Sequence, residues 1–152
     1  MRINWFSYIR VTGLLLVLIY HFFPSILPGG FIGVDVFFTF SGYLITALLI
    51  DEVSRTHRID YLGFMRRRFY RIVPRLVLMV LICTPLALLV RNDFIGGIGR
   101  QITSVIGFVT NYYEILTGGN YENQFNQHIY LHTWSLAIEI HYYILWGALL
   151  WF

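Results

Sequence analysis

Long apolar runs separated by short polar stretches make up most of this chain. Five apolar segments can be marked, at about residues 8–27, 33–50, 74–90, 100–117 and 131–152. A helix that crosses a bilayer needs about 20 mostly apolar residues. The first, third and fifth segments meet this length, and the second and fourth are marginal. The pattern predicts an all-α, polytopic transmembrane bundle of about five spanning helices.

The composition supports a membrane protein. Hydrophobic residues make up 57% of the chain and charged residues only 12%, whereas soluble domains carry about 25% charged residues. The lipid bilayer is therefore the expected surroundings. The basic residues are not interleaved with aromatic residues on a polar surface, so we expect no nucleic-acid partner.

The arginines predict an orientation. All eleven basic residues are arginine, and seven of them lie between residues 51 and 75. Short cytoplasmic loops collect Lys and Arg, so a loop over residues 51–73 is expected inside. The start of the first helix, with Arg2 and Arg10, is then also inside. Strict alternation would bring residues 118–128 inside too, but no arginine supports that side, and it stays open.

Both ends of the chain raise a question of processing. The first apolar segment could be a signal peptide, but it continues to Leu27 without a small-residue cleavage site. A retained helix is the favoured interpretation. The last segment ends as LLWF inside an apolar run, so we expect a fragment of a larger membrane module.

Arg10 and His21 form the first candidate site. They are eleven positions apart, so on a helix they share one face to within about 20° and lie about 16 Å apart. Pro24 removes an amide donor and predicts a kink that would open space beside His21. Ionisable residues inside a membrane are commonly functional. The alternative is a snorkelling Arg10 and a His21 that bonds a neighbouring helix.

A second polar face lies on the second segment. Asp35, Thr39, Gly42 and Thr46 are spaced 4, 3 and 4 apart, and Asp35 would need a partner such as Arg10 or His21. Packing of small residues between helices also explains Thr39, Gly42 and Thr46 well, but it explains Asp35 poorly.

The arginine-rich stretch before the third segment offers an anion site. Arg68, Arg71 and Arg75 occupy positions i, i+3 and i+7, and guanidinium groups bind phosphate oxygens in a bidentate manner. A phosphate site for a nucleotide-type cofactor is one interpretation. A positively charged anchor on anionic lipid is the other.

The fifth segment carries polar residues within an apolar run. His132, Ser135 and Glu139 fall on one helix face, and a carboxylate at that depth must be paired or protonated. Histidine, carboxylate and arginine are sufficient for proton transfer and oxyanion stabilisation. The sequence has no GxSxG, HExxH or P-loop motif and no convincing metal cluster, so we expect no metal.

Four stretches, in order, resemble the acyltransferase-3 family of integral-membrane O-acyltransferases. They are the R-x10-H pair Arg10 and His21, PGGFIGVDVFFTFSGYLIT (28–46), RRFYRIVP (67–74) and HTWSLAIEIHYYILW (132–146). The amino-acid sequence of these stretches is most similar to that of Gram-positive peptidoglycan O-acetyltransferases. Ile140 and His141 stand where the family often has Glu-Gln. Residues 1–152 would form the N-terminal part of such a domain, whose membrane module has about ten helices in this family.

The resemblance implies roles for these residues. His21 would act as general base or transient acyl carrier, while Arg10 and Glu139 position the donor. The phosphates of a cytoplasmic acyl-CoA, expected to be acetyl-CoA, would be held by Arg67, Arg68 and Arg71. The residues expected to bind the acceptor are Asp35, His132, Trp134 and Ser135. The acceptor would be a glycan hydroxyl, first of all of peptidoglycan, at the outer side of a multi-pass cell-membrane protein.

Two other functions stay open. The chain could be part of a proton-coupled transporter in which His21, Asp35 and Glu139 relay protons, or it could be a truncated, inactive product.

Overall fold

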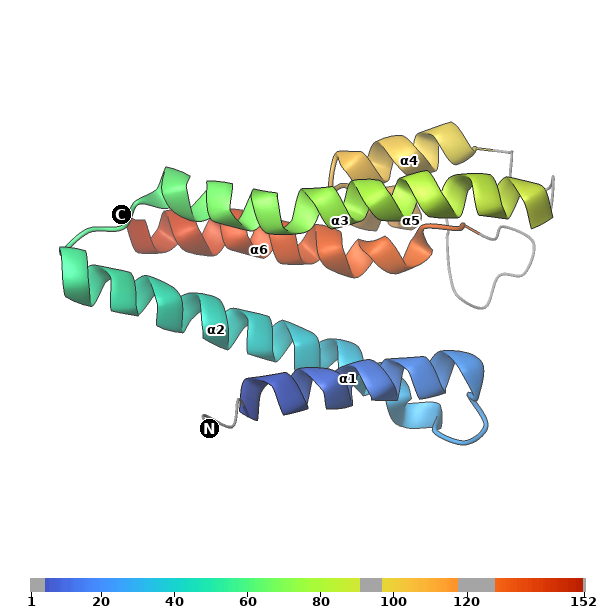
Figure 1. The fold of residues 1–152 in the computed structure, drawn as a ribbon, viewed down its shortest axis with the longest axis horizontal. Helices are drawn as coiled ribbons and strands as arrows, with labels where there is room; N and C mark the ends of the chain where they lie inside the picture. The colour runs from blue at the N-terminus through green and yellow to red at the C-terminus, as the bar shows by residue number, and fades with distance from the viewer. Residues whose placement is uncertain (1–4, 91–96, 118–127, 152) are drawn as a thin grey trace. The chain divides into compact units, whose positions relative to one another are not determined.

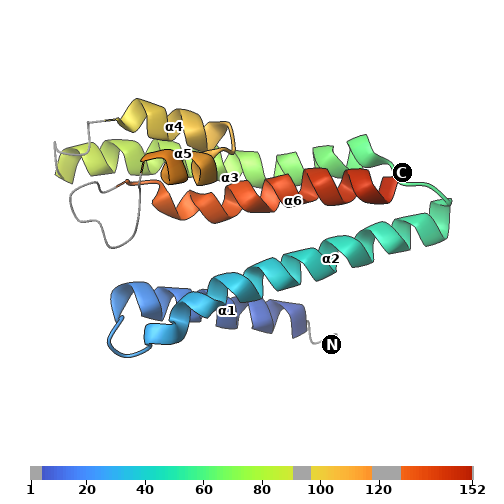
Figure 2. The same ribbon diagram turned by 180° about the vertical axis from the view of Figure 1, so that it is seen from behind.

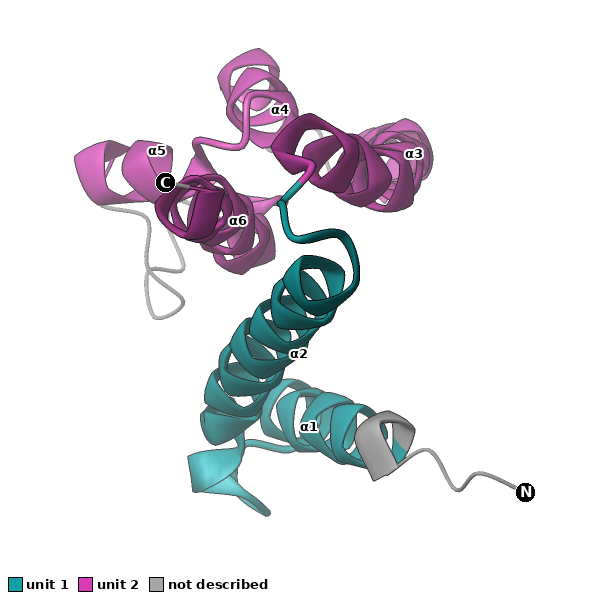
Figure 3. Cartoon of the chain, turned by 90° about the vertical axis from the view of Figure 1, so that its left-hand side faces the viewer, with its two compact units in different colours: residues 1–59 teal, residues 60–152 magenta. Residues whose placement is uncertain are grey.

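The computed structural model describes residues 5–90, 97–117 and 128–151, and for residues 5–7 the backbone only. Within these ranges the chain is helical and contains no strand, which confirms the all-α prediction. The α-helices are α1 (Trp5–Phe22), α2 (Ile32–Thr56), α3 (Tyr61–Val90), α4 (Ile98–Ile106), α5 (Thr110–Thr117) and α6 (Trp134–Trp151). Two short 3-10 helices, η1 (Pro28–Phe31) and η3 (Leu131–Thr133), precede α2 and α6 (Figure 1). The chain divides into two compact units, Met1–Ile59 and Asp60–Phe152 (Figure 3).

Glycines bring α1 and α2 of the first unit together. A Cβ atom on Gly33 would lie 2.4 Å from the carbonyl oxygen of Gly13 and 2.8 Å from a methyl carbon of Val17. A Cβ atom on Gly30 would lie 2.5 Å from the carbonyl oxygen of Leu16. Only glycine permits this approach, as at helix contacts in membranes, where small residues let two backbones come close.

The first helix ends earlier than the sequence suggested. α1 stops at Phe22, the amide of Phe23 donates to the carbonyl of Ile19 at 2.7 Å, and Pro24 lies in the turn that follows. The predicted kink at Pro24 is therefore wrong. A proline just beyond a helix end stops the helix because it cannot donate the next hydrogen bond. His21 consequently lies in the last turn of α1.

The predicted 51–73 loop is also wrong, because most of it is helical. α2 continues to Thr56 and α3 begins at Tyr61, so only residues 57–60 connect the two helices. His57 ends α2 in the left-handed conformation (φ 55°), and its amide donates to the carbonyl of Val53 at 2.8 Å. Asp60 starts α3 by accepting a hydrogen bond from the amide of Gly63 at 2.9 Å. The arginine cluster thus lies mainly on α3.

Among the described residues, two helical stretches are long and apolar enough to cross a membrane. They are Pro28–Thr56, with 29 residues, and Tyr61–Val90, with 30 residues, while the apolar stretch Tyr8–Phe22 is shorter. α6 has 18 residues. The crossing of the membrane by the first and fifth predicted segments therefore stays a prediction.

The fourth predicted segment is a hairpin of two short helices and not one span. α4 has 9 residues and α5 has 8, so they are only about 13 and 12 Å long. At the turn, the amides of Gly107, Phe108 and Val109 donate to carbonyls of α4 at 2.9–3.2 Å. Phe108 adopts a positive φ of 53°. The turn thus satisfies its own backbone amides.

In the second unit α3 and α6 run antiparallel (Figures 1 and 2). At one end the hydroxyl of Tyr61 donates to the carbonyl of Ile144 at 3.3 Å. Toward the other end the hydroxyls of Thr84 and Tyr130 are 2.6 Å apart. A buried core of Leu76, Val80, Val105 and Tyr130 joins α3 to α4 and to the chain before α6.

The antiparallel packing of α3 and α6 requires the chain between them to stay at one end of the pair. α6 begins at the end of the pair where α3 finishes. At that end α4 packs against the C-terminal half of α3, and α5 packs against α6 (Figures 1 and 2). The hairpin therefore enters and leaves at one end. Residues 118–127, whose side the sequence left open, lie outside the described residues.

The contact between Gly33 and α1 predicts a specific sensitivity. Gly33→Ala should lower the free energy of unfolding by about 1–3 kcal/mol, the usual cost of overpacking, because its methyl group would collide with the backbone of Gly13. Gly29→Ala is the matched control, because a Cβ atom there meets nothing within 4 Å. Denaturant titration of both variants in detergent checks the difference. Equal stabilities would contradict the close contact.

Candidate functional site

Arg10 and His21 lie on one uninterrupted helix, as their spacing predicted. Arg10 is half-buried and His21 is exposed in the last turn of α1. His21 Nδ1 lies 2.8 Å from the carbonyl oxygen of Val17. A carbonyl can only accept, so Nδ1 carries the hydrogen in the neutral ring and Nε2 has the lone pair. The imidazole is thus held as the tautomer whose outer nitrogen can take a proton.

Asp35 lies exposed in the first turn of α2. In the described part of the chain it forms no ion pair with Arg10 or His21, so the predicted pairing is wrong. The positive end of the helix dipole stabilises a carboxylate in that turn instead. Thr46 donates to the carbonyl of Gly42 at 2.8 Å, a bond internal to the helix that fits the packing interpretation of this face.

A cluster on α3 and α6 holds the best-packed arginine of the predicted set. We call Phe64, Arg68, Glu139 and Tyr143 the Arg68 cluster. The Arg68 guanidinium carbon lies 5.5 Å from the centre of the Phe64 ring and 6.0 Å from that of Tyr143. The Tyr143 hydroxyl donates to the Glu139 carboxylate. Aromatic faces and a carboxylate stabilise a cation in this arrangement, so Arg68 is held in one place.

The guanidinium of Arg68 has an unused hydrogen-bond donor. Its Nε atom is buried and has no hydrogen-bond partner. Arg67 and Arg71 place like charges near it, while Glu139 supplies an opposing charge. A buried polar group without a partner is costly. An anion that accepted from Arg68 would satisfy this donor and reduce the mutual repulsion of the three arginines.

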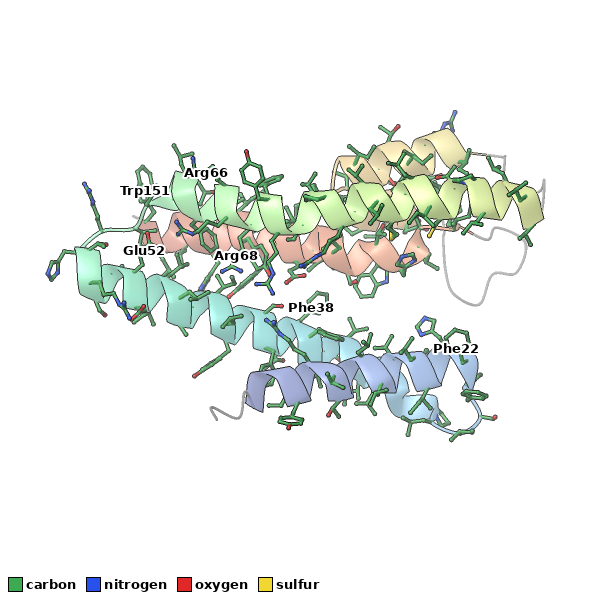
Figure 4. The ribbon with its side chains drawn as sticks, in the orientation of Figure 1. Phe22, Phe38, Glu52, Arg66, Arg68 and Trp151 are labelled. Carbon is green, nitrogen blue, oxygen red and sulfur yellow. The ribbon has the colours of Figure 1, made fainter. Side chains whose placement is uncertain are left out.

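The other arginines of α3 are more exposed than Arg68. Arg67, Arg71 and Arg75 are exposed, whereas Arg68 is half-buried. Arg66 and Arg68 leave α3 on different sides (Figure 4), as expected for residues two positions apart on a helix. The predicted face of Arg68, Arg71 and Arg75 therefore has one fixed guanidinium and two exposed ones.

The predicted acceptor residues at the start of α6 lie about two turns from Glu139. His132 belongs to η3, Trp134 is the first residue of α6, and the hydroxyl of Ser135 donates to the carbonyl of His132 at 3.1 Å. Seven residues along a helix amount to about 10 Å. His132 in η3 and Glu139 on α6 are therefore too far apart along the chain to form one compact site.

Sequence reasoning missed two features of the second unit. One is Tyr143, which the helical spacing of four from Glu139 could have revealed. The other is a buried pair in which His128 Nδ1 lies 2.6 Å from Glu114 Oε2. Fourteen residues separate these partners, so no local spacing marks them. In the described ranges no group of three or more His, Cys, Asp or Glu side chains could hold a metal ion.

Comparison with known proteins identifies the family. The acyltransferase-3 model, described as an acyltransferase domain, matches residues 3–152. The chain belongs to the acyltransferase-3 family. All four stretches that suggested this resemblance lie inside the match.

The relatives agree with one another. The chain is 38% identical over 144 residues to O-acetyltransferase OatA of Staphylococcus aureus strain NCTC 8325 / PS 47, which covers 95% of this chain and 24% of that protein. The OatA of strain MRSA252 matches with the same identity and coverage. The chain therefore spans about a quarter of the length of these curated relatives. No solved structure matches it.

Proposed function

We propose that this chain carries the donor-binding and catalytic residues of an acyl-CoA-dependent membrane O-acyltransferase. The donor is cytoplasmic acetyl-CoA, and the acceptor is a hydroxyl of an envelope glycan, peptidoglycan in the first place. Membership of the acyltransferase-3 family and similarity to relatives named O-acetyltransferase support this proposal. The structural observation that carries it is the buried, unpartnered Nε of Arg68 between two arginines of like charge.

The arginines of α3 bind the donor's phosphates. Arg67, Arg68 and Arg71 lie within five residues on one helix, and their forks match phosphate oxygens. The Arg68 cluster fixes one guanidinium, so less side-chain entropy is lost when phosphate binds. By the positive-inside rule this end of α3 faces the cytoplasm, where acyl-CoA is available.

His21 handles the proton of the acceptor. As the acceptor oxygen bonds to the acyl carbon, His21 Nε2 takes the hydroxyl proton. The bond from carbon to sulfur then breaks, and the proton passes to the departing thiolate. Arg10 helps to bind the donor, as the family resemblance implies, and Glu139 positions the donor or balances its charge. The protein is a multi-pass protein of the cell membrane, with donor and acceptor on opposite sides.

Replacing His21 should stop transfer. Because this chain spans about a quarter of OatA, the assay uses OatA in which the chain replaces the matching residues. Vesicles are supplied with acetyl-CoA labelled in the acetyl group, and label in the glycan is counted. His21→Ala should lower the rate by about 10²–10⁴-fold, the usual contribution of a general base.

Phe22→Ala is the control for that assay, because Phe22 is the exposed neighbour of His21 at the end of α1 (Figure 4). It should keep nearly full activity. A His21→Ala rate above half that of the unsubstituted chimera would remove His21 from the mechanism. Failure of the unsubstituted chimera to transfer label would contradict the proposed function. By the fragment interpretation, the 152-residue chain alone is expected to be inactive.

Replacing Arg68 should weaken donor binding. Arg68→Ala removes a charge-assisted hydrogen bond worth about 1.5–3 kcal/mol, so the Kd for coenzyme A should rise about tenfold or more. Arg68→Lys should restore only part of the affinity for coenzyme A, because lysine lacks the planar guanidinium that binds two phosphate oxygens at once. Calorimetric titration of the chain in detergent with coenzyme A gives these values.

Arg66→Ala is the matched control for Arg68→Ala. Arg66 lies on the same helix, but it leaves α3 on a different side (Figure 4). Coenzyme A binding should change little in this variant. Equal effects of the two substitutions would show a general positive surface, which is the lipid-anchor interpretation.

A further inference from the structure

The buried Glu114–His128 pair retains an unused hydrogen-bond acceptor. Glu114 is only 6% exposed. Its Oε2 lies 2.6 Å from His128 Nδ1, while its Oε1 is buried and has no hydrogen-bond partner. An ionised carboxylate can only accept hydrogen bonds, and leaving a buried oxygen unsatisfied is costly. A ligand that donates a hydrogen to this oxygen would remove the cost.

A second unused acceptor lies on the same face of α5. Asn111 precedes Glu114 by three positions, and its Oδ1 is also buried without a partner. Residues three apart on a helix are neighbours. The ring of Tyr113 lies 5.4 Å from the ring of His128. Two acceptors beside aromatic rings are the kind of lining that positions a small polar ligand.

Buried hydrogen bonds hold the segments that carry Glu114 and His128. The Thr133 hydroxyl donates to the carbonyl of Tyr130 at 2.8 Å, and its oxygen lies 3.1 Å from that of the Thr110 hydroxyl. Thr110 is the first residue of α5, and Thr133 ends η3. These bonds join α5 to the segment that carries His128, so the acceptors are fixed before any ligand binds.

The polarity of these groups selects the ligand. The Arg68 cluster offers an unused donor, which suits an anion, whereas α5 offers unused acceptors and a carboxylate, which repel one. With Nδ1–H directed at Glu114, the neutral His128 ring has its lone pair on Nε2. A neutral ligand rich in hydroxyl donors, that is a carbohydrate, matches this set.

We infer that Glu114, His128 and Asn111 form a binding site for carbohydrate hydroxyls, and that this site receives the acceptor glycan. The inference rests on the proposed function for the identity of the ligand as acceptor. The position supports it, because α5 lies at the end of the second unit where α3 finishes, whereas Arg68 lies near the beginning of α3 (Figures 1 and 2). Donor and acceptor would thus bind toward opposite ends of the second unit.

Titration with a neutral saccharide tests the site directly. The probe is a tetramer of N-acetylglucosamine, added to the chain in detergent. Glu114→Gln, which keeps the shape of the side chain, should raise the Kd for the tetramer about tenfold and leave binding of coenzyme A unchanged. Asp51→Asn removes one negative charge at an exposed ion pair with Arg55, so this control should alter neither. Unchanged tetramer binding in Glu114→Gln would make the pair purely structural.

A measurement on the unsubstituted chain covers the case in which the variant fails to fold. The tetramer should shift the imidazole NMR signals of His128, and coenzyme A should not. Absence of tetramer binding, or bound tetramer without a shift at His128, overturns the inference even if coenzyme A binds. Tetramer binding with loss at Glu114→Gln, but no binding of coenzyme A, would support the saccharide site and contradict the proposed function instead.

Discussion

The packing of α3 against α6 determines the surroundings of Arg68 and Glu139 in the second unit. It brings the guanidinium of Arg68 over the rings of Phe64 and Tyr143, and Tyr143 in turn bonds Glu139. A Cβ atom on Gly147 would lie 2.9 Å from the ring of Tyr61, so glycine is needed for the close approach of the two helices there. Charged groups inside apolar surroundings are stable only with such partners. The cluster therefore depends on this helix pair.

The short α4–α5 hairpin gives the second unit different chemistry at its two ends. Because the hairpin enters and leaves at one end, the buried acceptors of α5 lie at the end of the unit where α3 finishes, and the arginines lie near the beginning of α3. In the proposed function an anionic donor and a neutral acceptor would bind at these two ends, so opposite charges would not compete at one site.

The sequence was sufficient for the helices and the family, and it failed where tertiary contacts decide. The length of the apolar runs located α1, α2, α6 and the C-terminal part of α3. It missed that Pro24 ends a helix, and it mistook charged helical residues for a loop, because polarity alone does not distinguish an exposed helix from a turn. It also could not show that residues 100–117 fold back at Phe108.

Site residues that depend on local helical spacing could be predicted, and those that depend on tertiary contacts could not. Helical spacing placed Arg10 with His21 correctly on one helix. The Glu114–His128 pair had no signal, because its partners meet only after the chain reverses, and Tyr143 was overlooked beside Glu139 although its spacing was visible.

Labelling of cysteines from one side of the membrane tests whether the two ends of the second unit face opposite sides. Cys83, the only cysteine, is replaced by serine, and Leu62→Cys and Leu116→Cys are introduced singly at exposed positions of this unit. A membrane-impermeant maleimide is added to intact cells. Position 116 is expected to be labelled directly, and position 62 only after the membrane is opened. Labelling of both positions from the same side would contradict the opposite orientation of the two ends.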